Sequence, residues 1–159
     1  MNKEKIIEKI LEKLTADLEA VTLSAKAAHD AATNEESKAE DAHDTRGLEA
    51  SYLAGAQKKR ALELNNQITS YRLLPTAPLS KGSAIGAGAL VELSRNGKSS
   101  YYFLVGDGGG ITIEMDGKRI NVVSAKSPMG EELLDRKESE IVELEVQNSL
   151  LEYVILKVI

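Results

Sequence analysis

The chain has 159 residues, a length that fits one ordinary domain or a small domain joined to an extended element. Its formal net charge of −5 disfavours free-standing binding to nucleic acid, so a protein partner is expected. The sequence has no cysteine and no apolar stretch near the roughly 18 residues that a membrane-spanning helix needs, so disulfides and thiolate metal sites are excluded and a cytoplasmic protein without membrane association is expected.

The two parts of the chain differ in composition. Residues 1–75 contain only two of the 12 glycines, and no proline precedes Pro75. Pro75 and Pro78 lie close together, and two prolines in such a short segment would end any helix. We therefore predict a helical hairpin over residues 1–75 and a separate C-terminal domain over residues 76–159.

Residues 1–75 carry two apolar seams with alternating steps of four and three, the heptad pattern of a coiled coil. The first seam consists of Ile7, Leu11, Leu14, Leu18, Val21, Ala25, Ala28 and Ala32. The second consists of Ala50, Ala54, Gln57, Ala61, Leu64, Ile68 and Tyr71. Lysine and glutamate, beginning with Lys3 and Glu4, are expected on the solvated faces.

Two such helices in one chain, joined by a short polar segment, predict an antiparallel coiled-coil hairpin. Each arm has roughly 28–35 residues and is about 40–50 Å long at a rise of about 1.5 Å per residue. A coiled coil that dimerises is the alternative, but we expect a monomer.

The turn of the hairpin lies between residues 33 and 49. Thr33–Glu36 and Ser37–Glu40 both match a capping box, and Asp44–Gly47 is an equally good break, so the sequence leaves the position of the turn open. This segment is acidic, and its carboxylates include Glu36, Glu40, Asp41, Asp44 and Glu49.

Three of these acids would share one face if the first helix continued through them. Glu36, Glu40 and Asp44 lie four residues apart, where like charges repel by a few tenths of a kcal/mol per pair. Clustered carboxylates are the ligands that Mg²⁺ prefers, which favours a metal-binding function. A solvated helix end with acidic caps is the alternative.

No catalytic constellation of the chain's own is visible. His29 and His43 lack a third ligand at zinc spacing. No Ser-His-Asp or Cys-His pattern is present, so we do not expect an enzyme. A single Phe and no Trp disfavour an aromatic-lined pocket.

The C-terminal part has the pattern of a β-rich domain. The predicted strands are 89–93, 100–105, 111–115, 119–123, 141–146 and 151–156. Asn96-Gly97 and Asp116-Gly117 are typical of two-residue hairpin turns. The run Gly108–Gly110 is expected to be a flexible turn, since no Lys-Ser/Thr follows it. Ser127-Pro128 predicts the start of a short helix. The fold class is therefore α+β, with a curved antiparallel sheet and one short helix.

Several segments resemble the C-terminal domain of the bacterial GreA/GreB transcription elongation factors, an FKBP-like fold. They are Ser127-Pro128-Met129-Gly130, Leu133–Lys137, Glu140–Val146 and Tyr153–Leu156. The resemblance implies that RNA polymerase is the partner and that nucleic acid is contacted only through the transcription complex. It also implies that the β domain docks on the polymerase rim while the hairpin enters the secondary channel.

The resemblance further implies a function for the acidic tip. The family tip, similar to Gly-Asp-x-x-Glu-Asn-Ala-Glu-Tyr, aligns with residues 43–52, with Ala50 and Tyr52 in register. By this comparison Asp44 and Glu49 are the tip acids that assist the polymerase in cleaving backtracked RNA. They would share a Mg²⁺ ion supplied within the polymerase active site, with Glu36, Glu40 and Asp41 as further candidate ligands.

The register of the tip departs from the family. Asp44 takes the place of the family aspartate only with a one-residue insertion, and Glu49 lies near the family's acidic position. An insertion of one residue rotates a helical side chain by about 100°. A regulator that enters the channel without stimulating cleavage is therefore an alternative. A prolyl isomerase with a helical arm is a third possibility, disfavoured by the scarcity of aromatic residues.

Overall fold

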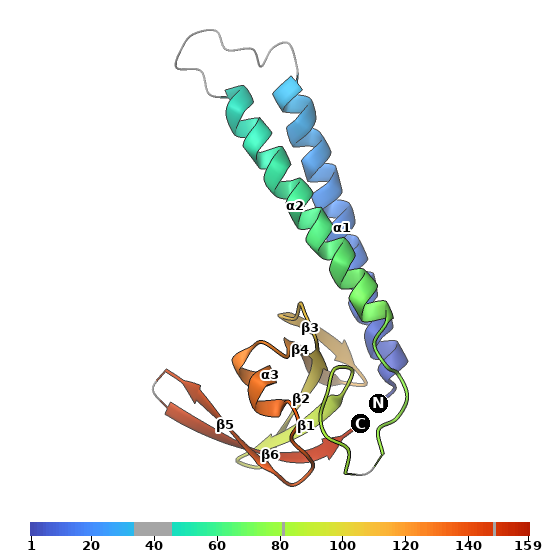
Figure 1. The fold of residues 1–159 in the computed structure, drawn as a ribbon, viewed down its shortest axis with the longest axis vertical. Helices are drawn as coiled ribbons and strands as arrows, with labels where there is room; N and C mark the ends of the chain where they lie inside the picture. The colour runs from blue at the N-terminus through green and yellow to red at the C-terminus, as the bar shows by residue number, and fades with distance from the viewer. Residues whose placement is uncertain (34–45, 81, 148) are drawn as a thin grey trace. The chain divides into compact units, whose positions relative to one another are not determined.

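The computed structural model describes residues 1–33, 46–80, 82–147 and 149–159, without the side chains of residues 46–48 (Figure 1). The helices of this part are α1 (Lys3–Thr33), α2 (Arg46–Arg72) and α3 (Pro128–Leu133). The strands are β1 (Leu90–Arg95), β2 (Lys98–Val105), β3 (Ile111–Met115), β4 (Lys118–Ser124), β5 (Ile141–Val146) and β6 (Ser149–Val158). Among the described residues, no helix combines the length and the apolar character needed to cross a membrane.

The chain forms two compact units. One consists of Leu11–Thr69, and the other combines Met1–Ile10 with Ser70–Ile159. This division by compactness differs from the predicted domain boundary between residues 75 and 76, which stays a prediction. The fold class is confirmed, because a helical hairpin precedes a curved six-stranded sheet.

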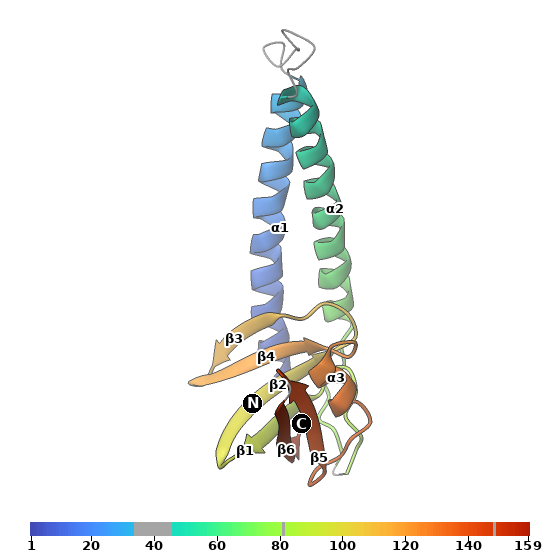
Figure 2. The same ribbon diagram turned by 90° about the vertical axis from the view of Figure 1, so that its left-hand side faces the viewer.

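The unit Leu11–Thr69 is a coiled-coil hairpin. The helices α1 and α2 run side by side in opposite directions (Figures 1 and 2). Every predicted seam residue of this unit is buried or half-buried, and Leu14 and Leu64 are only 2% and 0% exposed. At about 1.5 Å per residue, the 31 residues of α1 and the 27 of α2 are roughly 46 and 40 Å long. The predicted seams are therefore confirmed.

The first turn of α1 differs from the prediction for its solvated face. Lys3 is only 4% exposed, and its ammonium group has no hydrogen-bond partner among the described residues. Removal from water lowers the pKa of Lys3, because burial disfavours the charged form. Lys3 belongs to the unit that contains the sheet, and a heptad pattern read within α1 alone gives no sign of this environment.

Tyr71 ends the second seam in the same unit. It is 1% exposed, and burial raises the pKa of its hydroxyl to about 12. The backbone of Gly109 lies near this hydroxyl and partly offsets the rise, although the two groups do not meet the geometry of a hydrogen bond. The seam therefore continues into the unit that contains the sheet.

The sheet has the order β3-β4-β2-β1-β6-β5. Four of its pairings are antiparallel, as predicted, but β2 and β4 pair in parallel, from Tyr101↔Ile120 to Val105↔Ser124. The prediction of a wholly antiparallel sheet is wrong at this pairing. The reason is that β3 crosses to the outer edge of the sheet, so that the hairpin back from β3 places β4 beside β2 with the same direction.

Local signals set the turns and the curvature. Asn96 and Gly97 have φ values of 51° and 75°, and Asp116 and Gly117 have 53° and 71°, which confirms the predicted tight hairpin turns. The register between β1 and β6 shifts between Glu92 and Leu93, and such bulges bend a strand. One face of the sheet packs under α3. The core there consists of Ile85, Ala89, Val91, Leu93, Leu104, Met129, Leu133, Val142 and Ile155.

The hairpin offers a direct test of the seam. Leu64→Ala should lower the free energy of unfolding by about 2–5 kcal/mol, because it leaves a cavity at a fully buried position. Leu62→Ala, at a position that is 62% exposed on the same helix, should change it by less than about 0.5 kcal/mol. Urea unfolding followed by circular dichroism measures both variants. Equal losses for the two would contradict the assigned seam.

Candidate functional site

Most of the predicted metal ligands at the tip lie outside the described residues. Glu36, Glu40, Asp41 and Asp44 belong to the segment 34–45, so their predicted function stays a prediction. Glu49 is described and lies exposed in the first turn of α2. A carboxylate at this end of a helix is stabilised by the helix dipole. Within the described ranges, no group of three or more His, Cys, Asp or Glu side chains could hold a metal ion.

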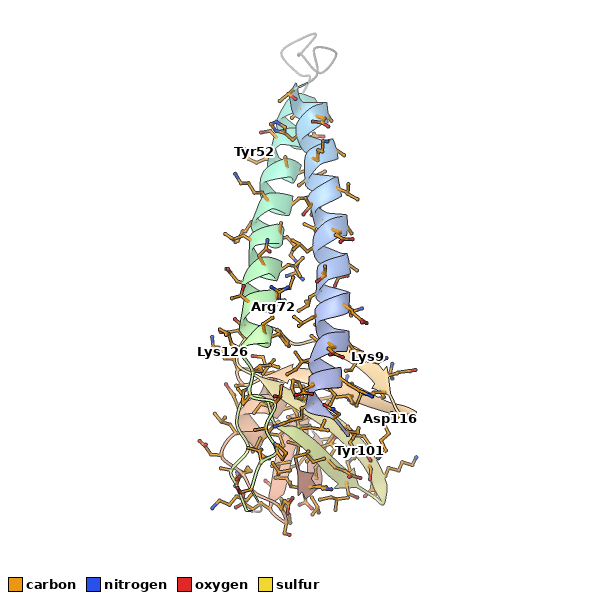
Figure 3. The ribbon with its side chains drawn as sticks, turned by 90° about the vertical axis from the view of Figure 1, so that its right-hand side faces the viewer. Lys9, Tyr52, Arg72, Tyr101, Asp116 and Lys126 are labelled. Atoms are coloured by element: carbon orange, nitrogen blue, oxygen red, sulfur yellow. The ribbon has the colours of Figure 1, made fainter. Side chains whose placement is uncertain are left out.

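Tyr52, which is in register with the family's tip motif, is 73% exposed on α2 (Figure 3). Most tyrosine side chains of this chain lie in or beside the sheet and are largely covered, as Tyr101 is at 8%. An aromatic ring exposed close to Glu49 gains nothing from packing in the free protein. The described start of α2 therefore presents an acid and an aromatic ring to solvent.

The seam of the hairpin is hollow where its residues are small. A groove of about 500 Å³ lies between α1 and α2, with Ala25, Ala54 and Gly55 among its lining residues. Lys26, His29 and Lys58 also line it, so its rim is basic although the chain as a whole is acidic. The heptad pattern predicts neither the groove nor its basic rim.

A larger groove lies on the sheet beside α3. It has a volume of about 670 Å³ and is formed by β3, β4, β5 and the start of α3. Its mainly apolar lining includes Gly110, Ile111, Val122, Pro128, Met129 and Val146. Pro128 and Val146 are exposed, and Val146 retains 40% of its surface in solvent. An open apolar groove with exposed aliphatic walls is typical of a surface that binds a protein partner.

The wall at α3 is fixed by a tight local structure. Ser127 is the N-cap of α3, as predicted, and its Oγ accepts a hydrogen bond from the Gly130 N–H at 3.2 Å. The same hydroxyl donates to the Ser124 carbonyl oxygen at 2.6 Å. These two bonds join the end of β4 to the first turn of α3 and hold Pro128 at the groove.

Two glycines let the backbone segments of this region approach each other. A Cβ atom on Gly130 would overlap the carbonyl oxygen of Ser124, and one on Gly109 would lie 2.8 Å from the Ser124 N atom. Gly109 also has φ of 111°, which other residues rarely adopt. The glycine run predicted as a flexible turn is therefore a close crossing over the end of β4.

The sequence predicted the segments that line this groove, but not how these segments come together. The glycine run precedes β3 and the Ser-Pro motif follows β4, so the antiparallel pairing of β3 with β4 brings the two together. No local signal shows that β5 supplies a further wall of the same groove. The turn chemistry at Ser127 was the one signal that pointed to this surface.

A family match covers the part of the chain that contains the sheet. The family described as the C-terminal domain of transcription elongation factor GreA/GreB matches residues 80–159. No curated protein matches the sequence.

Among solved structures, GreA factor homolog 1 of Thermus thermophilus is 22% identical, with 94% of each chain covered and a TM-score of 0.38. Gfh1 of Thermus aquaticus is 20% identical over 98% of this chain and 92% of that chain, with a TM-score of 0.41. A GreA/GreB factor from Nitrosomonas europaea is 13% identical over 70% of this chain and 91% of that chain, with a TM-score of 0.38.

The groove wall can be tested by adding one methyl group. Gly130→Ala should lower the free energy of unfolding by about 1–3 kcal/mol or more, because the new Cβ overlaps the Ser124 backbone. Gly55→Ala should instead raise it by about 0.5–1 kcal/mol, since nothing lies within 4 Å of that position in α2. Thermal unfolding of both variants provides the measurement. A neutral Gly130→Ala would show that the crossing is loose.

Proposed function

This chain belongs to the GreA/GreB family of transcription elongation factors, and we propose that it binds RNA polymerase and stimulates cleavage of backtracked RNA. The observation that carries this proposal is the family match over residues 80–159, the part that contains the apolar groove beside α3. The hairpin that precedes it has the length and the acidic tip sequence that such a function requires. The polymerase, and not this chain, would carry the active site.

The groove beside α3 is the docking surface in this proposal. Its walls at Pro128 and Val146 are exposed, and its floor includes the buried Ile111, Val122 and Met129. Burying apolar surface of this kind against a partner contributes roughly 25 cal/mol per Å². The Ser127 cap fixes the groove before binding, so that little conformational entropy is lost on docking.

The hairpin would then enter the secondary channel and carry its acids to the polymerase active site. Asp44 and Glu49 would share a Mg²⁺ ion with polymerase residues, with Glu36, Glu40 and Asp41 as further candidate ligands. A carboxylate donor set suits Mg²⁺, and the exposed Glu49 carboxylate at the start of α2 fits that chemistry. The bound ion would position and activate the attacking water in a two-metal scheme.

A regulator that occupies the channel without stimulating cleavage is the second candidate. The observation that favours it is the register of the tip, in which Asp44 matches the family aspartate only with an inserted residue. Both ligands must approach one ion to about 2.0–2.1 Å, and a rotation of about 100° on a helix would separate them. Such a protein would use the same docking groove and alter pausing or initiation instead.

Docking is tested by placing a charge in the groove. Val146→Arg should weaken binding to RNA polymerase at least about tenfold, because an unpaired cation would be buried against an apolar contact. Leu134→Arg is the matched control, since Leu134 is 41% exposed and does not line the groove. Binding of labelled protein to core polymerase, followed by fluorescence anisotropy, measures both. Unchanged binding of Val146→Arg would remove the groove from the proposal.

Cleavage is tested with backtracked elongation complexes that carry labelled RNA and Mg²⁺. The wild-type protein should shorten the RNA, and Asp44→Ala with Glu49→Ala should reduce the rate at least about tenfold without weakening polymerase binding. Glu8→Ala with Glu12→Ala, two exposed acids on α1, is the control and should leave the rate unchanged. If the wild-type protein binds polymerase and the RNA keeps its length, the second candidate is correct.

A further inference from the structure

The ribbon of β5 and β6 has a second face, and of its described residues only Glu145 also lines the groove beside α3. Val142 and Ile155 point into the core and are each 1% exposed. Side chains alternate along a strand, so their neighbours Ile141 and Val154 lie on the opposite face, where they are 54% and 40% exposed. These two residues are direct cross-strand partners, and Leu150 on β6, at 59% exposure, extends the apolar surface.

The same face carries carboxylates that oppose each other. Glu143 on β5 pairs directly with Glu152 on β6, and both are exposed. Glu145 follows two residues along the same face. Neither a hydrogen bond nor an ion pair joins the carboxylate of any of these three acids to a described residue. Like charges directly across a strand pair are destabilising, so this arrangement weakens the free protein.

Glu92, an acid on another part of the sheet, does have a hydrogen-bond partner. Tyr101 donates a hydrogen bond from its hydroxyl to Glu92 Oε1 at 2.9 Å. Lys118 donates from Nζ to that hydroxyl at 2.7 Å, and its ammonium lies 4.4 Å from the centre of the tyrosine ring. The Glu92 carboxylate therefore accepts a hydrogen bond within the protein, whereas the Glu143 and Glu152 carboxylates accept none from a described residue.

Glu152, one member of the acidic pair, lines a shallow groove. The groove has a volume of about 490 Å³ and lies between the outer face of the ribbon and the β1–β2 turn, with Ile141, Leu150, Glu152 and Val154 among its lining residues. Arg95 also lines it, with its guanidinium 5.9 Å from the ring centre of Tyr153. Glu152 and Arg95 are the charged residues in the lining of this groove, and the outer face of the ribbon beside it is acidic through Glu143 and Glu145.

We propose that this outer face of β5 and β6 binds a protein segment in which aliphatic side chains are flanked by lysine or arginine. The aliphatic side chains would cover Ile141 and Val154, and the cations would lie between Glu143 and Glu152, where they relieve the repulsion of that pair. The charge of the face excludes a nucleic-acid backbone as its partner. A second copy of the chain is disfavoured, because pairing two β5 edges would bring the acids of both copies together.

The test uses the full chain and a short blocked peptide in which pairs of isoleucine alternate with pairs of lysine, so that each face of the extended peptide carries both residue types; the peptide carries a fluorophore. Fluorescence anisotropy should show binding that weakens as salt is added, and the same peptide with glutamate in place of lysine should not bind. Glu143→Gln with Glu152→Gln should weaken binding of the basic peptide at least about tenfold. The same double variant should unfold at a higher temperature than the wild type, because the repulsion is removed, which shows that it is folded.

Two further variants separate this face from general charge attraction. Glu8→Gln with Glu12→Gln removes the same charge from α1 and should leave the affinity unchanged. Ile141→Ser should weaken binding, because the apolar part of the contact is lost. The proposal is overturned if the Glu143 and Glu152 variant binds as tightly as the wild type. It is also overturned if sedimentation shows a dimer that Ile141→Lys dissociates, since a second copy would then occupy the face.

Discussion

The hairpin depends on the burial of two apolar seams against each other. Neither α1 nor α2 could persist alone in water, because most helical stability comes from packing an apolar face and not from the intrinsic preference of the residues. Large side chains such as Leu14 and Leu64 provide that burial, while the alanine-rich part of the seam provides little apolar area. The alanine-rich part of the seam, which lies next to the tip segment in the sequence, therefore contributes little to the stability of the hairpin. Most of that stability comes from the leucine-rich part of the two helices.

The second constraint is the crossing of backbone segments beside α3. Gly109 passes close to Ser124, and Ser127 binds both Ser124 and Gly130. These contacts require small residues and one hydroxyl at fixed positions, and they shape the apolar groove before any partner arrives. A preformed groove of this kind would lose little entropy on binding, which is the property that the proposed docking function requires.

The β5–β6 ribbon contributes to the core with one face and exposes aliphatic and acidic residues on the other. On one face Val142 and Ile155 complete the core, and on the other face the aliphatic residues are exposed and the carboxylates have no ion-pair partner among the described residues. Because the alternation of a strand is strict, the same ten or so residues can satisfy both demands independently. Relief of the repulsion between Glu143 and Glu152 would favour the bound state without a change in the fold.

The sequence alone determined the features that depend on local period and turn chemistry. The heptad seams, the strands, the two hairpin turns and the Ser127 cap all follow from patterns only a few residues long. Short motifs within residues 127–156 were also sufficient to identify the family, whose match covers residues 80–159. It also named Asp44 and Glu49 as candidate tip acids, an assignment that rests on sequence.

Only the tertiary structure decided which elements meet. The parallel pairing of β2 with β4, the burial of Lys3 and the groove beside α3 all join residues far apart in the chain. A local pattern predicts that a strand or a helix exists and which of its faces is apolar, but it does not predict what packs against that face. That choice is made by the free energy of the whole assembly, because strand order and burial depend on which long-range contacts form together.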